Sequence, residues 1–331
     1  MAGKRKYVSE FSVGINSGGW LMITPEQLHS DGKMSARDQA ISDKCHIYMI
    51  CKRPKAICSP ETPTVQNGYI VGEVNSRVNG EQIKSSYKFP FYFEEEEKNL
   101  TVSAYPHREI FTTDSNGEGV RYLPGDLLAQ ATNNPIYFDF KVLYVGQAYA
   151  DGERTAIDRL KSHSTLQQIL AETMYNHPDD QVFIVMLEYS DYFLATTFNG
   201  MDKNALGGVE DELRLRSIYS NPLSKKEIIC LSEAGLIRYF QPQYNKIYRE
   251  SFPASDQKVL SGCFDLDFSG LSVEIELNES PLRLYSDNVE AKHHHLAVFN
   301  LVDESERLGF FTFSDGVNDP FTMDGIIQLT K

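Results

Sequence analysis

Four side chains that could cooperate in cutting a phosphodiester lie in order along the middle of this 331-residue chain: Tyr144, Arg159, His163 and Glu233. A carboxylate, together with water and phosphate oxygens, can hold a hard divalent cation such as Mg²⁺ or Mn²⁺. A guanidinium donates in a planar fork that suits a developing phosphoryl charge. A tyrosine or histidine beside the attacking water can orient or deprotonate it. The set therefore predicts metal-assisted hydrolysis of a phosphodiester.

The segments around the first three residues predict a strand, a loop and a helix. Residues 136–146 are apolar and aromatic, which favours one or two strands, and a polar loop follows. The apolar positions of residues 154–174 recur at helical spacing. Because residues four apart share one face of a helix, Arg159 and His163 are expected to reach the same phosphate.

A second helix is predicted over residues 225–240 and would carry Glu233. Ser224 is a good N-cap, and Glu227 three residues later can complete a capping box. Pro242 stops the helix. Asn245 then follows in the loop beyond it.

This ordered set resembles the GIY-YIG nuclease domain over roughly residues 135–250. Tyr144-Val145-Gly146 matches the second half of the motif that names the family, and Arg159 matches the arginine of its first helix. His163 resembles the arrangement in the restriction-endonuclease branch. Glu233 matches the metal-binding glutamate, and Gln243-Tyr244-Asn245 matches the motif that closes the domain.

The resemblance implies a small α/β nuclease core with a mainly antiparallel sheet, one divalent cation (Mg²⁺ or Mn²⁺) and cleavage of nucleic acid, double-stranded DNA being the expected substrate. It implies that Glu233 holds the metal and that Arg159 stabilises phosphoryl charge. Tyr144 and His163 would orient or deprotonate the attacking water, and Asn245 would position the site by hydrogen bonding. A role against foreign DNA is a further expectation from the family.

The first half of the motif, Gly-Ile-Tyr, is expected about ten residues before Tyr144. Pro135-Ile136-Tyr137 occupies the nearest place, with proline instead of glycine. Tyr137 is therefore the candidate for the first tyrosine, and Tyr122 farther upstream is the alternative.

The flanking regions are predicted to be β-rich, which gives an α+β fold with three units. These are an N-terminal domain at 1–130 for target binding or assembly, the nuclease domain at 131–252, and a C-terminal domain at 256–331. The net charge of −14 argues against broad affinity for nucleic acid. Most of the excess acid lies in the last unit, which is therefore expected to bind a protein partner, mediate oligomerisation or restrain the nuclease until an activator arrives.

Two alternatives remain open at this level. The domain could be a catalytically idle GIY-YIG fold kept for binding or assembly. Cys45, Cys51 and Cys58 lie near His46 and invite a zinc site, although their gaps are not typical of one and buried core cysteines are favoured. The odd number of cysteines, the lack of a roughly 20-residue apolar run and the N-terminal sequence predict a cytoplasmic protein.

Two other clusters are predicted to be surface features. The adjacent residues His293, His294 and His295 would alternate between the faces of a strand and so could not share one metal ion. Lys4-Arg5-Lys6 is expected to be a disordered solubilising end or an arm that contacts phosphate.

Overall fold

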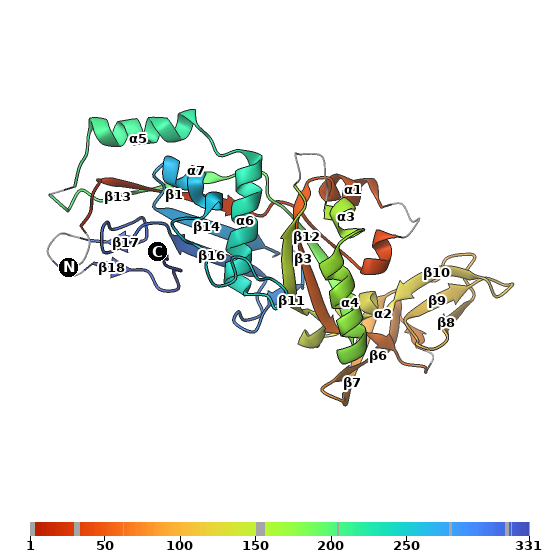
Figure 1. Cartoon of the computed structure of the whole chain (residues 1–331). Helices are drawn as coiled ribbons and strands as arrows, with labels where there is room; N and C mark the ends of the chain where they lie inside the picture. Colours follow the sequence, from red (N-terminus) through yellow and green to blue (C-terminus); the bar gives the residue numbers. More distant parts are fainter. Residues whose placement is uncertain are drawn as a thin grey trace.

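A five-stranded sheet with the order β15-β11-β3-β12-β2 occupies the centre of this computed structural model (Figure 1). The structure describes residues 4–29, 34–61, 63–149, 156–203, 205–277, 280–314, 318 and 320–330. Strands β11 and β12 pair antiparallel with β3, and β2 pairs antiparallel with β12, while the short β15 runs parallel to β11. The strand bounds are β2 Trp20–Ile23, β3 Cys45–Pro54, β11 Asp139–Gln147, β12 Asp180–Glu188 and β15 Arg283–Tyr285.

Both faces of this central sheet are apolar and covered. Successive side chains of a strand point to opposite faces, so Ile47 and Met49 enter one core while Tyr48 and Ile50 enter the other. Helix α6 (Lys225–Phe240) covers the first face. Helices α3 (Ala156–Leu160) and α4 (Ser164–Asn176) cover the second.

A second sheet, with the order β13-β1-β14-β16, lies beside the first and shares its α6-covered core. Its strands come from distant parts of the chain: β1 Ser9–Asn16, β13 Phe193–Phe198, β14 Gly270–Glu276 and β16 His294–Asn300. Helices α5 (Val209–Ser220) and α7 (Ser261–Asp265) lie against it (Figure 1). The predicted α+β class is confirmed, but the boundaries near 130 and 252–256 do not coincide with these sheets, because each sheet combines early and late strands.

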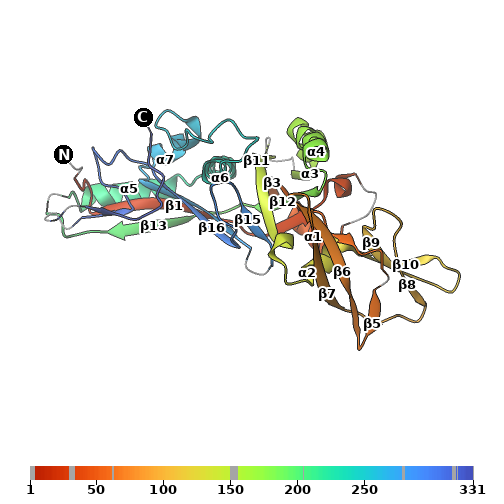
Figure 2. The same cartoon turned by 90° about the horizontal axis from the view of Figure 1, so that it is seen from below.

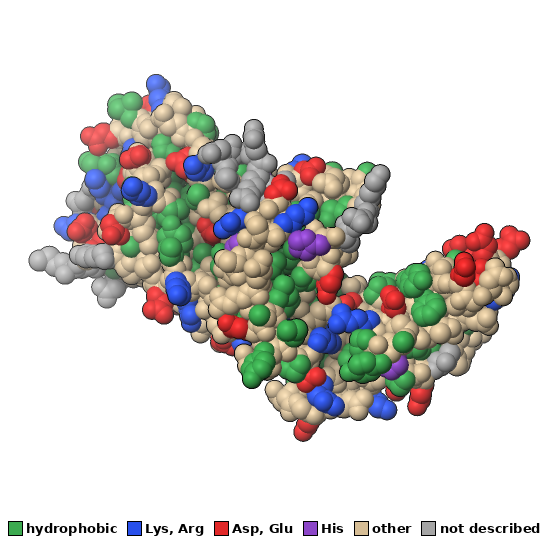
Figure 3. Space-filling model, turned by 45° about the vertical axis from the view of Figure 1, so that its right-hand side comes forward, with side chains coloured by type: hydrophobic (Ala, Val, Ile, Leu, Met, Phe, Trp, Pro, Cys, Tyr) green, Lys and Arg blue, Asp and Glu red, His purple; other side chains and the backbone are tan. Residues whose placement is uncertain are grey.

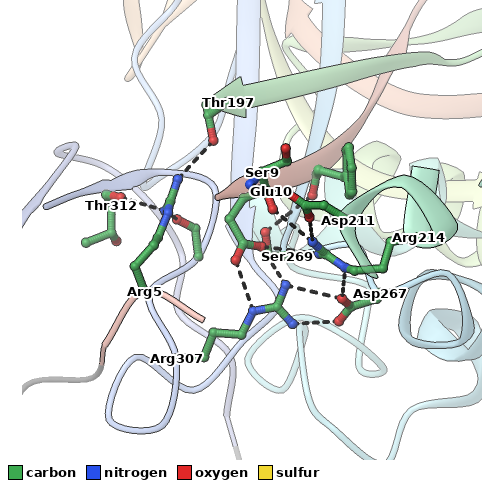
Figure 4. Close-up of polar contacts among 12 residues, drawn as sticks. Arg5, Ser9, Glu10, Thr197, Asp211, Arg214, Asp267, Ser269, Arg307 and Thr312 are labelled. Atoms are coloured by element: carbon green, nitrogen blue, oxygen red, sulfur yellow. Dashed lines mark hydrogen bonds and ion pairs between the residues drawn. The ribbon is translucent and has the colours of Figure 1, made fainter. Parts of the chain in front are cut away.

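The second sheet is tied together by a group of buried and partly buried charges, here called the ionic cluster: Arg5, Glu10, Asp211, Arg214, Asp267 and Arg307 (Figure 4). Arg307 lies 2.6 Å from both Glu10 and Asp267. Arg214 lies 2.6 Å from Asp267 and 2.8 Å from Asp211. These contacts join β1, α5, the turn after α7 and the C-terminal segment.

The chain segment 55–138 forms an insert between β3 and β11 with its own core. It contains two small sheets, and helix α2 (Gly125–Gln130) packs into that core. Figures 1 and 2 show the insert on one side of the central sheet and the second sheet on the other. The strands of the insert are β4 Ile57–Cys58, β5 Thr64–Gln66, β6 Tyr69–Val78, β7 Glu81–Pro90, β8 Asn99–Val102, β9 Glu109–Thr113 and β10 Gly119–Pro124.

Arg53, at the end of β3, holds the insert to the central sheet. Its guanidinium is buried, lies 2.6 Å from Asp126 of α2, and packs over the rings of Phe140 and Phe183. A buried arginine needs such a partner, because an unpaired charge in the interior is costly. The insert is thus anchored at its base rather than hanging from two flexible linkers.

The remaining elements are short: η1 Pro25–Leu28, α1 Ala36–Ser42, η2 Pro135–Tyr137, η3 Lys258–Leu260, β17 Thr312–Phe313 and β18 Phe321–Thr322. Within the described ranges, every helix is too short or too polar to span a membrane.

Several predictions of local structure differ from the structure. The predicted helix over 154–174 is two helices, α3 and α4, separated at residues 161–163, and residues 150–155 lie outside the described part. Residues 135–137 form a 3-10 turn instead of the start of a strand. The helix over 225–240 and its capping box are confirmed.

The two clusters predicted at the surface are partly buried. Arg5 is 2% exposed and donates to the backbone oxygens of Gly309 and Thr312, so it is neither a disordered end nor a phosphate-contacting arm. The three histidines alternate as predicted, but His295 is buried and lies 3.3 Å from the Tyr239 hydroxyl, because its strand has one face in the core.

Candidate functional site

Two tyrosines lie side by side at one end of the central sheet. Gly146 of β11 pairs directly with Tyr48 of β3, and Tyr144 precedes Gly146 by two residues, so all three share one face. The rings of Tyr48 and Tyr144 are 6.2 Å apart. A Cβ on Gly146 would lie 2.7 Å from atoms of both rings, which is closer than carbon atoms pack. Glycine is therefore required here for the two rings to meet.

His163 is the N-cap of α4 and contacts Tyr48. Its Nδ1 accepts a hydrogen bond from the backbone N–H of Leu166 at 3.2 Å, and its Nε2 lies 3.1 Å from the Tyr48 hydroxyl. An unprotonated Nδ1 places the proton of a neutral imidazole on Nε2. His163 thus donates to Tyr48. Burial, aided by the Arg159 charge, lowers the pKa of His163 to about 4, which keeps it neutral.

Arg159 reaches the same tyrosines from the last turn of α3. It is half-buried and hydrogen bonds with the Tyr48 side chain. Burial raises the pKa of Tyr48 and of Tyr144, and the Arg159 charge opposes that rise at both. Tyr48 also hydrogen bonds with Tyr144 and lowers its pKa, as a donor would. The Tyr48 oxygen accepts hydrogen bonds from His163 and Arg159, and its O–H donates to Tyr144. The Tyr144 hydroxyl is therefore the last group in this series of hydrogen bonds.

Glu233 approaches this group from α6, on the opposite face of the sheet. Its Oε2 accepts from the Gln147 side chain at 2.9 Å, at the end of β11. Burial raises the pKa of Glu233 to about 7, although hydrogen bonds from Gln147 oppose the rise. The Glu233 charge raises the pKa of both Tyr48 and Tyr144, so the carboxylate lies within electrostatic reach of them. We call Tyr48, Tyr144, Arg159, His163 and Glu233 the tyrosine cluster.

Asn245 fixes the strand that carries Tyr144. Its side-chain amide exchanges two hydrogen bonds of 2.9 Å with the backbone N–H and C=O of Val145. The backbone N–H of Tyr244 donates to Leu143, where the ladder between β11 and β3 shifts register. Asn245 thus takes the place of a neighbouring strand at the free edge of β11. These contacts hold β11 in place beside Tyr144.

Two predicted features of the site differ from the structure. Tyr137 lies in the core of the insert and bonds to Ser76 at 2.9 Å, so it is not part of the tyrosine cluster. Tyr122 lies on β10 of the insert and is 53% exposed. Tyr48 takes the place beside Tyr144 instead. The sequence signal for it is the apolar strand containing Ile47-Tyr48, but nothing local links that strand to Tyr144 across the insert.

Whether the tyrosine cluster can bind a metal ion depends on Glu233. In the described part of the chain, no group of three or more histidine, cysteine or acidic side chains is arranged to hold an ion. A single carboxylate with an elevated pKa still suits one hard cation whose other ligands are water and phosphate, since such a cation would stabilise the ionised form. The cysteines do not form a zinc site: Cys45, Cys51 and Cys58 are buried in three different cores.

The surface around the opposite end of β3 is hollowed between the insert and the central sheet (Figure 3). This cleft has a volume of about 520 Å³, and its lining includes Lys55, Tyr105, Arg108 and Asp179. Tyr48 is seven residues from Lys55 along an extended strand, so the cleft lies roughly 20 Å from the tyrosine cluster. It is a separate feature of the molecule.

Comparisons with known proteins return nothing: no protein-family model, no curated protein and no solved structure matches this chain.

Proposed function

We propose that this chain is a metal-dependent endonuclease of the GIY-YIG type, which hydrolyses phosphodiester bonds of double-stranded DNA. The observation that carries the proposal is the tyrosine cluster: two tyrosines on adjacent antiparallel strands, with Arg159, His163 and Glu233 converging from three different helices or helix ends. The pairing of Tyr48 with Gly146 supports it further, because it sets the strand with Ile47-Tyr48 beside Tyr144-Val145-Gly146, whereas Ile136-Tyr137 lies in a 3-10 turn. A role in defence against foreign DNA belongs to the same proposal.

In this mechanism Arg159 stabilises negative charge on the phosphoryl oxygens as the water attacks and the P–O bond breaks. It is half-buried beside the tyrosines, so its charge is screened less than that of a surface arginine. Glu233 would hold a divalent cation, which when bound neutralises the phosphate and makes its water more acidic. Gln147 orients the carboxylate for that task through the 2.9 Å hydrogen bond.

The tyrosines orient the water and phosphate rather than remove a proton. The pKa values of Tyr48 and Tyr144 are raised by burial, so both stay as phenols at neutral pH. Nδ1 of His163 is engaged by the backbone and its Nε2 carries a proton, so His163 has no free lone pair with which to act as a base. His163 is thus a positioning residue that fixes Tyr48, and the donor end of the chain at Tyr144 can bond a phosphate oxygen.

The proposed setting is the cytoplasm. All five cysteines are free thiols, as a reducing compartment would keep them. The proposal leaves a place for an activating protein partner, since the chain as a whole is acidic and would approach DNA only through local contacts.

Incubating the full chain with supercoiled plasmid and Mg²⁺ or Mn²⁺ tests the proposal. We expect nicked or linear product, which disappears with EDTA and with Glu233→Ala. Glu96→Ala is the matched control, because Glu96 is an exposed carboxylate of the insert. Cleavage by Glu233→Ala at the rate of the Glu96→Ala control would exclude the proposed metal-binding role of Glu233. A lack of cleavage by the wild type on plasmids of varied sequence would favour the alternative of an idle fold.

A further inference from the structure

Helix α5 lies on the outer side of the second sheet (Figure 1). It presents an apolar stripe to solvent. Val209, Leu213 and Tyr219 are 71%, 59% and 72% exposed. At 100° per residue, these three positions fall within about 120° of the helix surface together with Glu212 and Arg216. The opposite side of the helix faces inward, where Asp211 and Ile218 are buried. A surface helix normally turns its apolar side to the core, so this exposed stripe needs an explanation.

Four residues of the stripe, two apolar and two of opposite charge, are arranged symmetrically about position 214 in the sequence. Val209 and Tyr219 lie five residues on either side of it, and Glu212 and Arg216 lie two residues on either side. If two copies of α5 pack antiparallel with their centres at this position, Val209 meets the partner's Tyr219 and Glu212 meets the partner's Arg216. The two-fold operation repeats each contact in the other direction, so these four positions meet suitable partners, while Leu213 lies at the edge of the contact because its symmetric position, Leu215, packs against the core.

We propose that α5 is the interface of a homodimer, with a second copy of this chain packed antiparallel on the exposed stripe. Self-complementarity of apolar and charged positions selects a second copy, because an unrelated partner would not require symmetry about the helix centre. Glu212 and Arg216 already form an ion pair 2.5 Å long within one chain, and both side chains are more than half exposed. Each can therefore turn to the other copy at little cost.

Neighbouring side chains can extend this interface. The segment leading into α5 exposes Phe198, Met201 and Leu206 at 78%, 69% and 47%. A helix of this length is only about 18 Å long, and a stable interface buries roughly 800 Å² on each partner. The exposed apolar side chains before α5 supply further surface of the same kind. The dimer goes beyond the proposed catalytic function, and it does not depend on it.

The test measures the mass of the full chain by light scattering after size exclusion, across a range of protein concentrations. We expect a concentration-dependent dimer for the wild type. Glu212→Arg alone and Arg216→Glu alone place like charges across the two-fold axis, and each should weaken dimerisation at least tenfold. The double variant that carries both changes should restore it. Glu210→Arg is the matched control, because Glu210 is exposed on α5 but lies outside the stripe.

Circular dichroism of each variant checks that the fold is retained, and the double variant keeps the test valid if a single variant is unstable. A wild type that stays monomeric at all concentrations would overturn the proposal. So would a dimer whose affinity is the same in both single variants, since the copies would then meet through another surface.

Discussion

In the ionic cluster each acidic group faces at least one arginine, whereas in the tyrosine cluster the hydrogen bond that Glu233 accepts within the described part of the chain comes from the uncharged amide of Gln147. Glu10 is completely buried, yet Arg307 lies 2.6 Å away. Arg307 and Arg214 hold the pKa of Asp267 below its ordinary value, although burial pushes it upward. Around Glu233 burial prevails, and its pKa rises to about 7.

Such a difference is expected between charges that hold a fold together and a charge that binds a ligand. A buried and paired charge group is strongly destabilised when one partner is removed. A buried carboxylate without a cationic partner costs folding free energy, and such sites occur where a ligand or reaction supplies the missing charge. The comparison leads us to expect that substitutions in the ionic cluster affect stability and that substitutions in the tyrosine cluster affect activity.

Of the substitutions considered, Glu233→Gln is expected to lose the most cleavage activity. Removing the only carboxylate of the cluster should reduce cleavage about 1000-fold, since the metal ion would lose its anionic ligand and the phosphate would lose the cation that neutralises it. Stability should change in the opposite direction. Because the pKa of Glu233 is raised to about 7 in the folded protein, its ionisation destabilises the fold as pH rises from its ordinary value through 7.

Glu233→Gln should therefore be more stable than the wild type at pH 8, by about 3 kcal/mol, and equal to it at pH 4. Urea unfolding of both proteins at the two pH values measures this. A variant that is less stable than the wild type at pH 8 would mean that Glu233 is a structural group like those of the ionic cluster.

Glu10→Gln, in contrast, should lose stability and keep its cleavage activity. It removes the charge facing Arg307 in a fully buried position, and we expect a loss of about 3–5 kcal/mol in unfolding free energy. Asp287→Asn is the matched control, because Asp287 is 76% exposed in its ion pair with Lys141, and such surface pairs contribute less than about 1 kcal/mol. Cleavage by Glu10→Gln at a temperature where it stays folded should equal the wild-type rate.

Tyr48→Phe tests whether the Tyr48 hydroxyl of the tyrosine cluster contributes to cleavage. The change removes the oxygen that accepts from His163 and Arg159, so it should slow cleavage roughly 10–100-fold without unfolding the protein. The exposed Tyr92 of the insert provides the control Tyr92→Phe. Equal rates for the two variants would remove Tyr48 from the site.

The smallest effect concerns pH and metal affinity. Glu233 must be ionised to bind a cation, so apparent Mn²⁺ affinity should fall roughly tenfold between pH 8 and pH 6 as protons compete near its pKa of about 7. Calorimetric titration at both values measures the change. The Glu233→Gln variant, which has no such proton, should show weak binding that is independent of pH.

Local signals predicted part of this structure well. The capping box of Ser224 and Glu227 marks the start of α6, and Pro242 comes directly after its C-cap. The helix carrying Glu233 was thus predicted with its correct ends, because each signal lies within a few residues of the helix end that it marks. By contrast, the break between α3 and α4 depends on His163 capping a new helix, and the helical spacing continues through it.

The partner of Tyr144 was not predictable in the same way. Strand pairing between β3 and β11 joins residues on either side of the whole insert, and sequence patterns do not report which strands meet over such a distance. The family motif places its first tyrosine close to Tyr144 in the sequence, where Tyr137 lies. The same long-range pairing explains why sequential boundaries missed the two main sheets.

The insert also has a consequence for how this protein folds. The strands that carry Tyr48 and Tyr144 are joined by residues 55–138, and closing a loop of that length costs chain entropy before any contact rewards it. If the insert folds first around its own core, and the ion pair of Arg53 attaches it to the central sheet, then β3 and β11 are joined by a short rigid connection instead of a long loop. A weakened insert would then delay assembly of the tyrosine cluster even though it contributes no residue to it.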